Sequence, residues 1–175
     1  MRLLDQMPFT EFAGEVVVRG ERVQVRANQI IIWVSLGLHR IMEPNPAAVP
    51  FPAILDTGHT HTFSIQQRHL DEWAGLQPET LPILGAIREQ GQRLDLLGAH
   101  VWVHPNQRGQ QQRLADRPPY RIVAPRGIAV YSTGDFPRLP LLGLRAIADN
   151  ELILKADGKK RLATLRPARQ FWPFS

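Results

Sequence analysis

The sequence predicts an all-β domain that carries one or two short helices. Its apolar residues recur with a period of two rather than 3.6, and Gly and Pro together occupy 28 of the 175 positions. The apolar share of 43% is too high for a disordered chain, and so many helix breakers exclude a coiled coil. A chain of this length suffices for one domain with its own core.

Residues 1–27 are expected to form an N-terminal extension or an extra hairpin. Val16 and Val18 alternate with polar residues, as do Val23 and Val25 after the polar stretch Arg19-Gly20-Glu21-Arg22. Alternation on both sides of a Gly-containing stretch is typical of a β-hairpin. A removable pro-segment and an integral hairpin are both compatible with this pattern.

Two strands and a short helix are predicted next. Residues 30–38 (IIIWVSLGL) are rich in β-branched side chains, and residues 49–55 (VPFPAIL) begin a further strand. A helix of about ten residues should follow, with Ser64 or Thr62 as its N-cap and Gly75 just past its end.

The rest of the chain is predicted to consist of further strands and one polar loop. Residues 83–97 indicate two short strands around Gln90-Gly91, and residues 99–103 indicate another. Residues 104–119 contain three consecutive Gln and two adjacent Pro, which favour a long exposed loop. Strands are expected again at 120–123, at 127–131, and in a hairpin over 150–165 whose tight turn is Asp157-Gly158.

The charge is unevenly distributed. Residues 1–100 hold 8 basic and 11 acidic side chains, net −3, whereas residues 101–175 hold 13 and 5, net +8. Of the 21 basic residues 18 are Arg, which is suited to phosphate contacts. A basic β-rich nucleic-acid-binding protein is therefore an alternative. We do not expect nucleic acid as the partner, because no basic motif with interleaved aromatic residues accompanies the charge.

Several classes of protein are excluded or not expected. The chain has no Cys, so a disulfide, a thiolate nucleophile and a Cys-based metal site are excluded. Its longest apolar run has 5 residues (30–34), against roughly 20 for a membrane-spanning helix. Asp5 and Glu11 interrupt the region where a signal peptide would be apolar. We expect a cytoplasmic protein without a membrane partner. Without a Gly-rich phosphate loop or a Gly-x-Ser-x-Gly elbow, we expect no cofactor and no serine hydrolase.

One segment, FPAILDTGHTHTFSI (residues 51–65), carries recognisable chemistry. Its Asp56-Thr57-Gly58 tripeptide leaves an apolar strand and enters a polar stretch before the predicted helix. The segment resembles the active-site loop of retropepsin-like aspartic proteases, the single-lobed family that includes retroviral proteases. Residues 139–144 (LPLLGL) resemble the hydrophobic-hydrophobic-Gly signature that such domains carry near their carboxyl end.

The resemblance implies a single-lobed, closed β-barrel of the retropepsin-like type. It covers roughly residues 28–103 and 127–165. The implied organisation is a protease domain over 28–165 with the polar loop 104–119 as an insertion, preceded by residues 1–27 and followed by a tail over 166–175.

The resemblance also implies an aspartic endopeptidase that hydrolyses a peptide or protein substrate. Two carboxylates share one proton around a water; one deprotonates the water while the other polarises the carbonyl. Asp56 would be catalytic, Gly58 would let backbone donors approach its carboxylate, and Thr57 would tie the loop to its counterpart. The chain holds a single Asp-Thr-Gly, and residues 132–135 (STGD) have the wrong order and read as an ordinary turn. The second Asp must then come from a second copy, which implies a homodimer with its active site on the axis.

Residues 83–97 are the candidate flap. In the family's arrangement a substrate peptide lies extended between flap and carboxylates, with alternate side chains in apolar pockets. The candidate substrate-binding residues are Ile87, Gln90, Gly91 and Leu94. For Ile87 and Leu94 singly, a half-buried strand position is an equally good interpretation.

His59 departs from the family, which usually has Ala or Ser after the Gly. An imidazole there could pair with Asp56, lower the pKa of that carboxyl and weaken the shared-proton arrangement. A catalytically weak or inactive dimerisation or peptide-binding module is therefore the main alternative. His59 and His61 would face the same side of an extended segment, a spacing that metal sites use, with Asp56 or His69 as a third ligand. Given the resemblance, we expect no metal.

Overall fold

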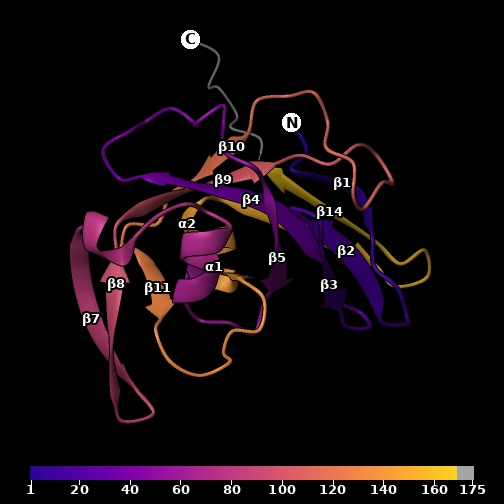
Figure 1. The fold of residues 1–175 in the computed structure, drawn as a ribbon. Helices are drawn as coiled ribbons and strands as arrows, with labels where there is room; N and C mark the ends of the chain where they lie inside the picture. Colours follow the sequence, from indigo (N-terminus) through magenta and orange to yellow (C-terminus); the bar gives the residue numbers. More distant parts are fainter. Residues whose placement is uncertain (169–175) are drawn as a thin grey trace.

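The structure, a computed structural model, describes residues 1–168. In this part of the chain strands predominate, and the two α-helices have six residues each, so the predicted all-β class with short helices is confirmed. The strands are β1 (Leu4–Pro8), β2 (Gly14–Val18), β3 (Glu21–Val25), β4 (Ile31–Leu38), β5 (Phe51–Asp56), β6 (Phe63–Gln66), β7 (Ile83–Glu89), β8 (Gln92–Leu97), β9 (Ala99–His104), β10 (Tyr120–Ile122), β11 (Ile128–Tyr131), β12 (Leu141–Gly143), β13 (Leu152–Asp157) and β14 (Leu162–Pro167). The helices are α1 (Gln67–Glu72) and α2 (Leu144–Asp149), with one 3₁₀ turn at Pro78–Thr80 (Figure 1).

The largest sheet has the strand order β10-β9-β4-β5-β12-β6-β11-β8-β7. Its centre combines distant parts of the chain, because β12 inserts parallel to β5 and antiparallel to β6. Among the described residues no pairing joins the edge strands β7 and β10, so the sheet is open and the expected closed barrel is not formed by the hydrogen-bonded ladder. β10 has only three residues and pairs with β9 alone, after which the chain returns to the interior of the sheet as β11.

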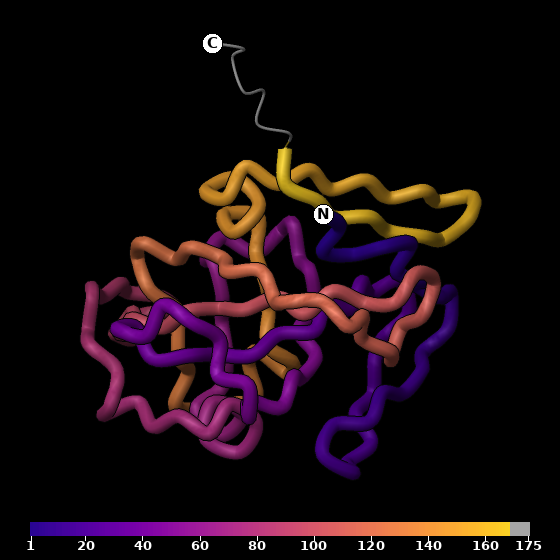
Figure 2. The backbone as a smooth tube through the Cα atoms, turned by 90° about the horizontal axis from the view of Figure 1, so that it is seen from above, coloured from indigo at the N-terminus to yellow at the C-terminus, as the bar shows by residue number. Residues whose placement is uncertain are grey.

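The first 27 residues pack into the same core as the rest of the domain. β1 pairs with β14, and β14 with β13, in a three-stranded sheet. Figure 2 shows the yellow β13–β14 hairpin beside the indigo N-terminal segment that contains β1. β2 and β3 form the predicted hairpin. The core residues from this region are Leu3, Leu4, Met7, Val16, Val18, Val23 and Val25.

Two of the predicted hairpin turns have the expected form. Arg19 and Gly20 have φ of 49° and 81°, and Gln90 and Gly91 have φ of 49° and 77°. Two consecutive positive φ angles match the twist of antiparallel strands, and the second position is Gly in both turns.

The tight turn predicted at Asp157-Gly158 is wrong in length. The hairpin β13–β14 exists, but residues 158–161 form its loop, and Arg161 rather than Gly158 has the positive φ, 51°. The Asp157 carboxylate accepts a hydrogen bond from the amide of Lys160 (2.9 Å), which stabilises the longer loop.

The predicted helix start is also wrong. Residues 63–66 form strand β6, and the six-residue helix α1 follows Gln66 rather than a Ser64 or Thr62 cap. β6 lies between β12 and β11, so its backbone is paired on both sides, and this tertiary pairing overrides the capping preference of Ser64. Gly75 follows the helix with φ of 67°, as predicted.

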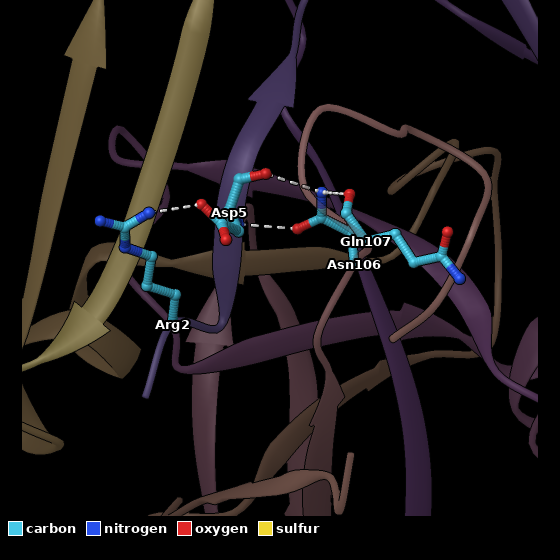
Figure 3. Close-up of polar contacts among 4 residues, drawn as sticks. All are labelled: Arg2, Asp5, Asn106 and Gln107. Carbon is cyan, nitrogen blue, oxygen red and sulfur yellow. Dashed lines mark hydrogen bonds and ion pairs between the residues drawn. The ribbon is translucent and has the colours of Figure 1, made fainter. Parts of the chain in front are cut away.

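The polar loop 104–119 is anchored to the domain by Asn106, which is 3% exposed. Its amide oxygen accepts from the Asp5 amide (2.8 Å), and its amide nitrogen donates to the carbonyl oxygens of Asp5 and Gln107 (Figure 3). The same nitrogen also donates to the Gln110 carbonyl (3.2 Å). The Trp33 indole also donates to the Gln111 carbonyl (2.7 Å). Hydrogen bonds at residues 106 and 111 therefore attach the loop to β1 and β4.

None of the helices within residues 1–168 is long and apolar enough to cross a membrane.

Candidate active site

Asp56 is the last residue of β5, whose five preceding residues are all buried. The backbone fixes its carboxylate, because the Gly58 amide donates to Oδ1 at 2.9 Å. A Cβ on Gly58 would lie 3.3 Å from the same Oδ1, so a side chain there would crowd the carboxylate. Asp56 is partly exposed, and Thr57 and Gly58 are exposed. The tripeptide thus presents an oriented carboxylate at the surface.

The second segment of the resemblance packs directly on this loop. Gly143 is the parallel register partner of Asp56 in the β5–β12 ladder. Its amide donates to the Thr62 carbonyl (3.0 Å), and the Leu144 amide donates to the His59 carbonyl (3.1 Å). The segments 51–65 and 139–144, distant in sequence, therefore form one structural unit.

His59 turns toward Ser64. Its Nε2 lies 2.6 Å from the Ser64 hydroxyl oxygen, and Ser64 is fully buried. Burial, followed by the neighbouring His61, lowers the pKa of His59 below its ordinary value, although Asp56 acts in the opposite direction. The neutral ring is therefore favoured, and its hydrogen bond goes to Ser64 rather than to the carboxylate of Asp56.

The candidate flap, the β7–β8 hairpin, reaches the same region through Glu89. The Tyr131 hydroxyl donates to Glu89 Oε2 (2.5 Å), and His61 Nε2 lies 3.6 Å from Glu89 Oε1. Burial and the bonded Glu89 carboxylate both raise the pKa of Tyr131. Sequence reasoning missed both Glu89 and Tyr131.

A cavity of about 460 Å³ lies between the flap turn and residues 132–136. Two of the predicted substrate-binding residues, Gln90 and Leu94, line it, whereas Ile87 and Gly91 do not. Ile87 instead pairs with Leu94 across the hairpin and packs on the small cluster of Leu94, Leu96 and Ala129. Residues 132–135 were predicted as an ordinary turn; the aromatic residues on either side, Tyr131 and Phe136, were the available signal for a cavity wall.

A second hollow opens beside the exposed tripeptide. It has a volume of about 490 Å³, and Thr57, Gly58, Leu144 and Arg145 are among the residues that line it. Leu144 is 50% exposed, and the Arg145 guanidinium donates to the Thr60 carbonyl (3.2 Å). An apolar side chain is therefore exposed next to the Asp56 loop.

The histidines considered as metal ligands do not form a metal centre in the described residues. The rings of His59 and His61 are 5.3 Å apart, and His69 stacks on Trp73 at 3.9 Å. Across residues 1–168, no group of three or more His, Asp or Glu side chains is arranged to hold a metal ion.

No family model matches the chain, and no curated protein matches its sequence. The geometry of the site is therefore the basis for a function.

Proposed function

We propose that the protein is a retropepsin-like aspartic endopeptidase that acts as a homodimer. The observation that carries the proposal is the placement of Asp56: its carboxylate is oriented by the Gly58 amide, and its strand pairs in register with Gly143. Asp56 and Gly143 belong to segments 51–65 and 139–144, which carry the resemblance. The contact of these two segments in the fold supports a retropepsin-type domain.

In the proposed reaction, Asp56 and the same residue of a second copy share one proton. The ionised carboxylate takes a proton from a water, whose oxygen then attacks the carbonyl carbon of the peptide bond. The protonated carboxyl gives its proton to the carbonyl oxygen. The carboxyl that took the proton from water then gives it to the nitrogen of the tetrahedral intermediate, the other carboxylate takes a proton from one of the intermediate's two hydroxyls, and the carbon–nitrogen bond breaks. The two carboxylates again share one proton.

The exposed surface around the tripeptide supports a symmetric dimer. Thr57 and Gly58 are accessible, and the exposed Leu144 stands beside them over the second hollow. An isologous interface over this surface would place each residue opposite its equivalent and so bring two Asp56 carboxylates together.

The test is cleavage of a mixed peptide library between pH 3 and pH 8 by wild type and by Asp56→Asn. We expect Asp56→Asn to abolish cleavage while the fold and the dimer mass in sedimentation are retained. Asp116→Asn is the matched control, since Asp116 is an exposed carboxylate of the polar loop and should leave cleavage unchanged. Cleavage by Asp56→Asn, or a wild-type chain that stays monomeric at all concentrations, would contradict the proposal.

One observation favours a second candidate function, a non-catalytic peptide-binding module. His59 places an imidazole immediately after Gly58, close enough to Asp56 for the carboxylate to affect the pKa of the ring. Binding of library peptides to wild type without release of products would favour this module over the endopeptidase.

A further inference from the structure

The tip of the β7–β8 hairpin is tied to the body of the domain through one side chain, Glu89. Glu89 is the last residue of β7, directly before the Gln90-Gly91 turn. One carboxylate oxygen accepts from the Tyr131 hydroxyl at 2.5 Å, and the other lies 3.6 Å from His61 Nε2. We refer to the contacts of Glu89 with Tyr131 and His61 as the flap latch.

The latch is connected to the loop that follows Asp56. His61 belongs to that loop, and its ring lies edge-on to the ring of His59, with ring centroids 5.3 Å apart. His59 Nε2 is in turn 2.6 Å from the Ser64 hydroxyl oxygen. Contacts therefore run from Glu89 at the flap tip through His61 to His59, the residue next to Gly58.

The hairpin has little other support near its tip. β7 is the edge strand of the large sheet, and its first residue, Ile83, is 61% exposed. The apolar contacts of the hairpin lie behind the tip, in the small cluster of Leu94, Leu96 and Ala129 with Ile87 and Tyr131 against it. Figure 1 shows the hairpin projecting at one side of the molecule. The position of the tip thus depends on Glu89.

The latch also forms part of the cavity wall. Glu89 and Tyr131 both line the cavity of about 460 Å³, together with Gln90 and Leu94. A peptide in this cavity would lie against the latch. Because a preformed site costs less to order on binding than a loose one, holding the tip in place favours binding.

We propose that Glu89 is a positioning residue, which holds the tip of the β7–β8 hairpin against Tyr131 and His61 and so preorganises the cavity of about 460 Å³ for a peptide. Its effect on cleavage rests on the proposed function, whereas the fixed position of the hairpin tip does not.

The first test measures hydrogen exchange of the flap amides, residues 83–97, in the ligand-free protein. We expect Glu89→Ala and Tyr131→Phe each to accelerate exchange at the tip about tenfold. The double variant should be no faster than the faster single variant, because both changes remove one shared contact. Glu89→Gln keeps an acceptor for the phenol and should retain most of the protection.

Arg88→Gln is the matched control, because Arg88 is an exposed charge on the same strand, next to Glu89. It should leave exchange unchanged. Tyr131→Phe keeps the aromatic ring that contacts Phe136, with ring centroids 5.1 Å apart, so this variant should fold even if Glu89→Ala does not. Unchanged exchange in Tyr131→Phe, or additive effects of the two single changes, would overturn the latch.

The second test separates binding from chemistry in peptide cleavage. Glu89→Ala should raise KM about tenfold and change kcat less than twofold, since Glu89 positions the flap and makes no contact with Asp56. A fall in kcat at unchanged KM would overturn the positioning role. If wild type cleaves no peptide, the proposed function fails, and the exchange experiment still decides whether the latch exists.

Discussion

Asp56 and Gly143 are register partners in a parallel ladder, although 87 positions separate them in the sequence. Glycine is required at position 143 because two backbone carbonyls of residues 59–61 lie against it. A Cβ atom at position 143 would lie 2.0 Å from the His61 carbonyl oxygen and 2.6 Å from that of His59. The loop that follows Asp56 therefore packs so closely on Gly143 that no side chain larger than a hydrogen atom fits at position 143.

Gly143→Ala is expected to lower the free energy of unfolding by about 3 kcal/mol, because two backbone carbonyls must move to accept the methyl group. Urea denaturation measures the loss. Gly158→Ala is the control, since a Cβ there meets nothing within 4 Å and the φ of Gly158 is not positive. Equal stability of the two variants would show that the 59–61 loop adapts freely.

His59→Ala is expected to cost about 1–3 kcal/mol of stability, because it leaves the buried Ser64 hydroxyl without its imidazole partner. Ser64→Ala made in the His59→Ala background should then cost less than it does in wild type. A double-mutant cycle by urea denaturation measures this coupling, and additive effects would mean that the 2.6 Å contact adds no stability.

Acid should destabilise the fold through two histidines, the buried His69 and the half-buried His104. Burial lowers the pKa of both His69 and His104 to about 4, from an ordinary value of 6.5. Between pH 6.5 and 4 the unfolded chain therefore binds more protons than the folded one. Stability is lost as the pH falls through this window, by at most about 1.4 kcal/mol per pH unit for each proton.

His104→Gln tests this linkage. His104 Nε2 lies 2.8 Å from the Ser35 hydroxyl oxygen, and the side-chain amide of a glutamine at this position can reach the same oxygen. That amide cannot take up a proton. Urea denaturation at pH 7 and pH 5 should show a smaller difference in stability for His104→Gln than for wild type. If the difference in stability between pH 7 and pH 5 were the same in the variant and in wild type, His104 would have the same pKa in the folded and the unfolded chain.

Asn106→Ala is expected to destabilise the protein by about 2 kcal/mol, because it removes the acceptor of the Asp5 amide and three hydrogen bonds that Asn106 donates to backbone carbonyls. Amides of the polar loop should exchange faster in this variant. Gln107→Ala is the control, since Gln107 joins the network through its carbonyl and its side chain is exposed (Figure 3). Unchanged exchange in Asn106→Ala would show that other contacts, such as Trp33 to Gln111, suffice.

Local signals predicted much of the fold. The stretch Arg19-Gly20-Glu21-Arg22 and the pair Gln90-Gly91 predicted two hairpins, because apolar residues alternate on both sides of a Gly, and the structure reduces each turn to two residues. β1 was not predicted: its sequence, LDQMP, has weak alternation, and its register shifts between Leu4 and Met7. The start of α1 was misplaced, because nothing local to Ser64 shows that β11 and β12 pair on both sides of it.

The candidate site was predictable where its contacts are local. Gly58 is two positions from the carboxylate that it orients, so the tripeptide alone indicated that contact. Glu89 and Tyr131 are 42 positions apart and are neighbours only because β8 pairs with both β7 and β11 in the large sheet. Ile87 was assigned to the cavity from strand alternation, but its side of the hairpin packs on Leu94 and Ala129.

The pairing of β1 with β14 has a consequence for biosynthesis. Leu4 lies opposite Leu165, so β1 waits for a strand that is translated 161 residues later. Throughout that delay Leu3, Leu4 and Met7, which the finished sheet covers completely, remain accessible to solvent and to other nascent chains. Folding of this protein in the cell should therefore depend on chaperones that shield these three residues until translation has passed β14.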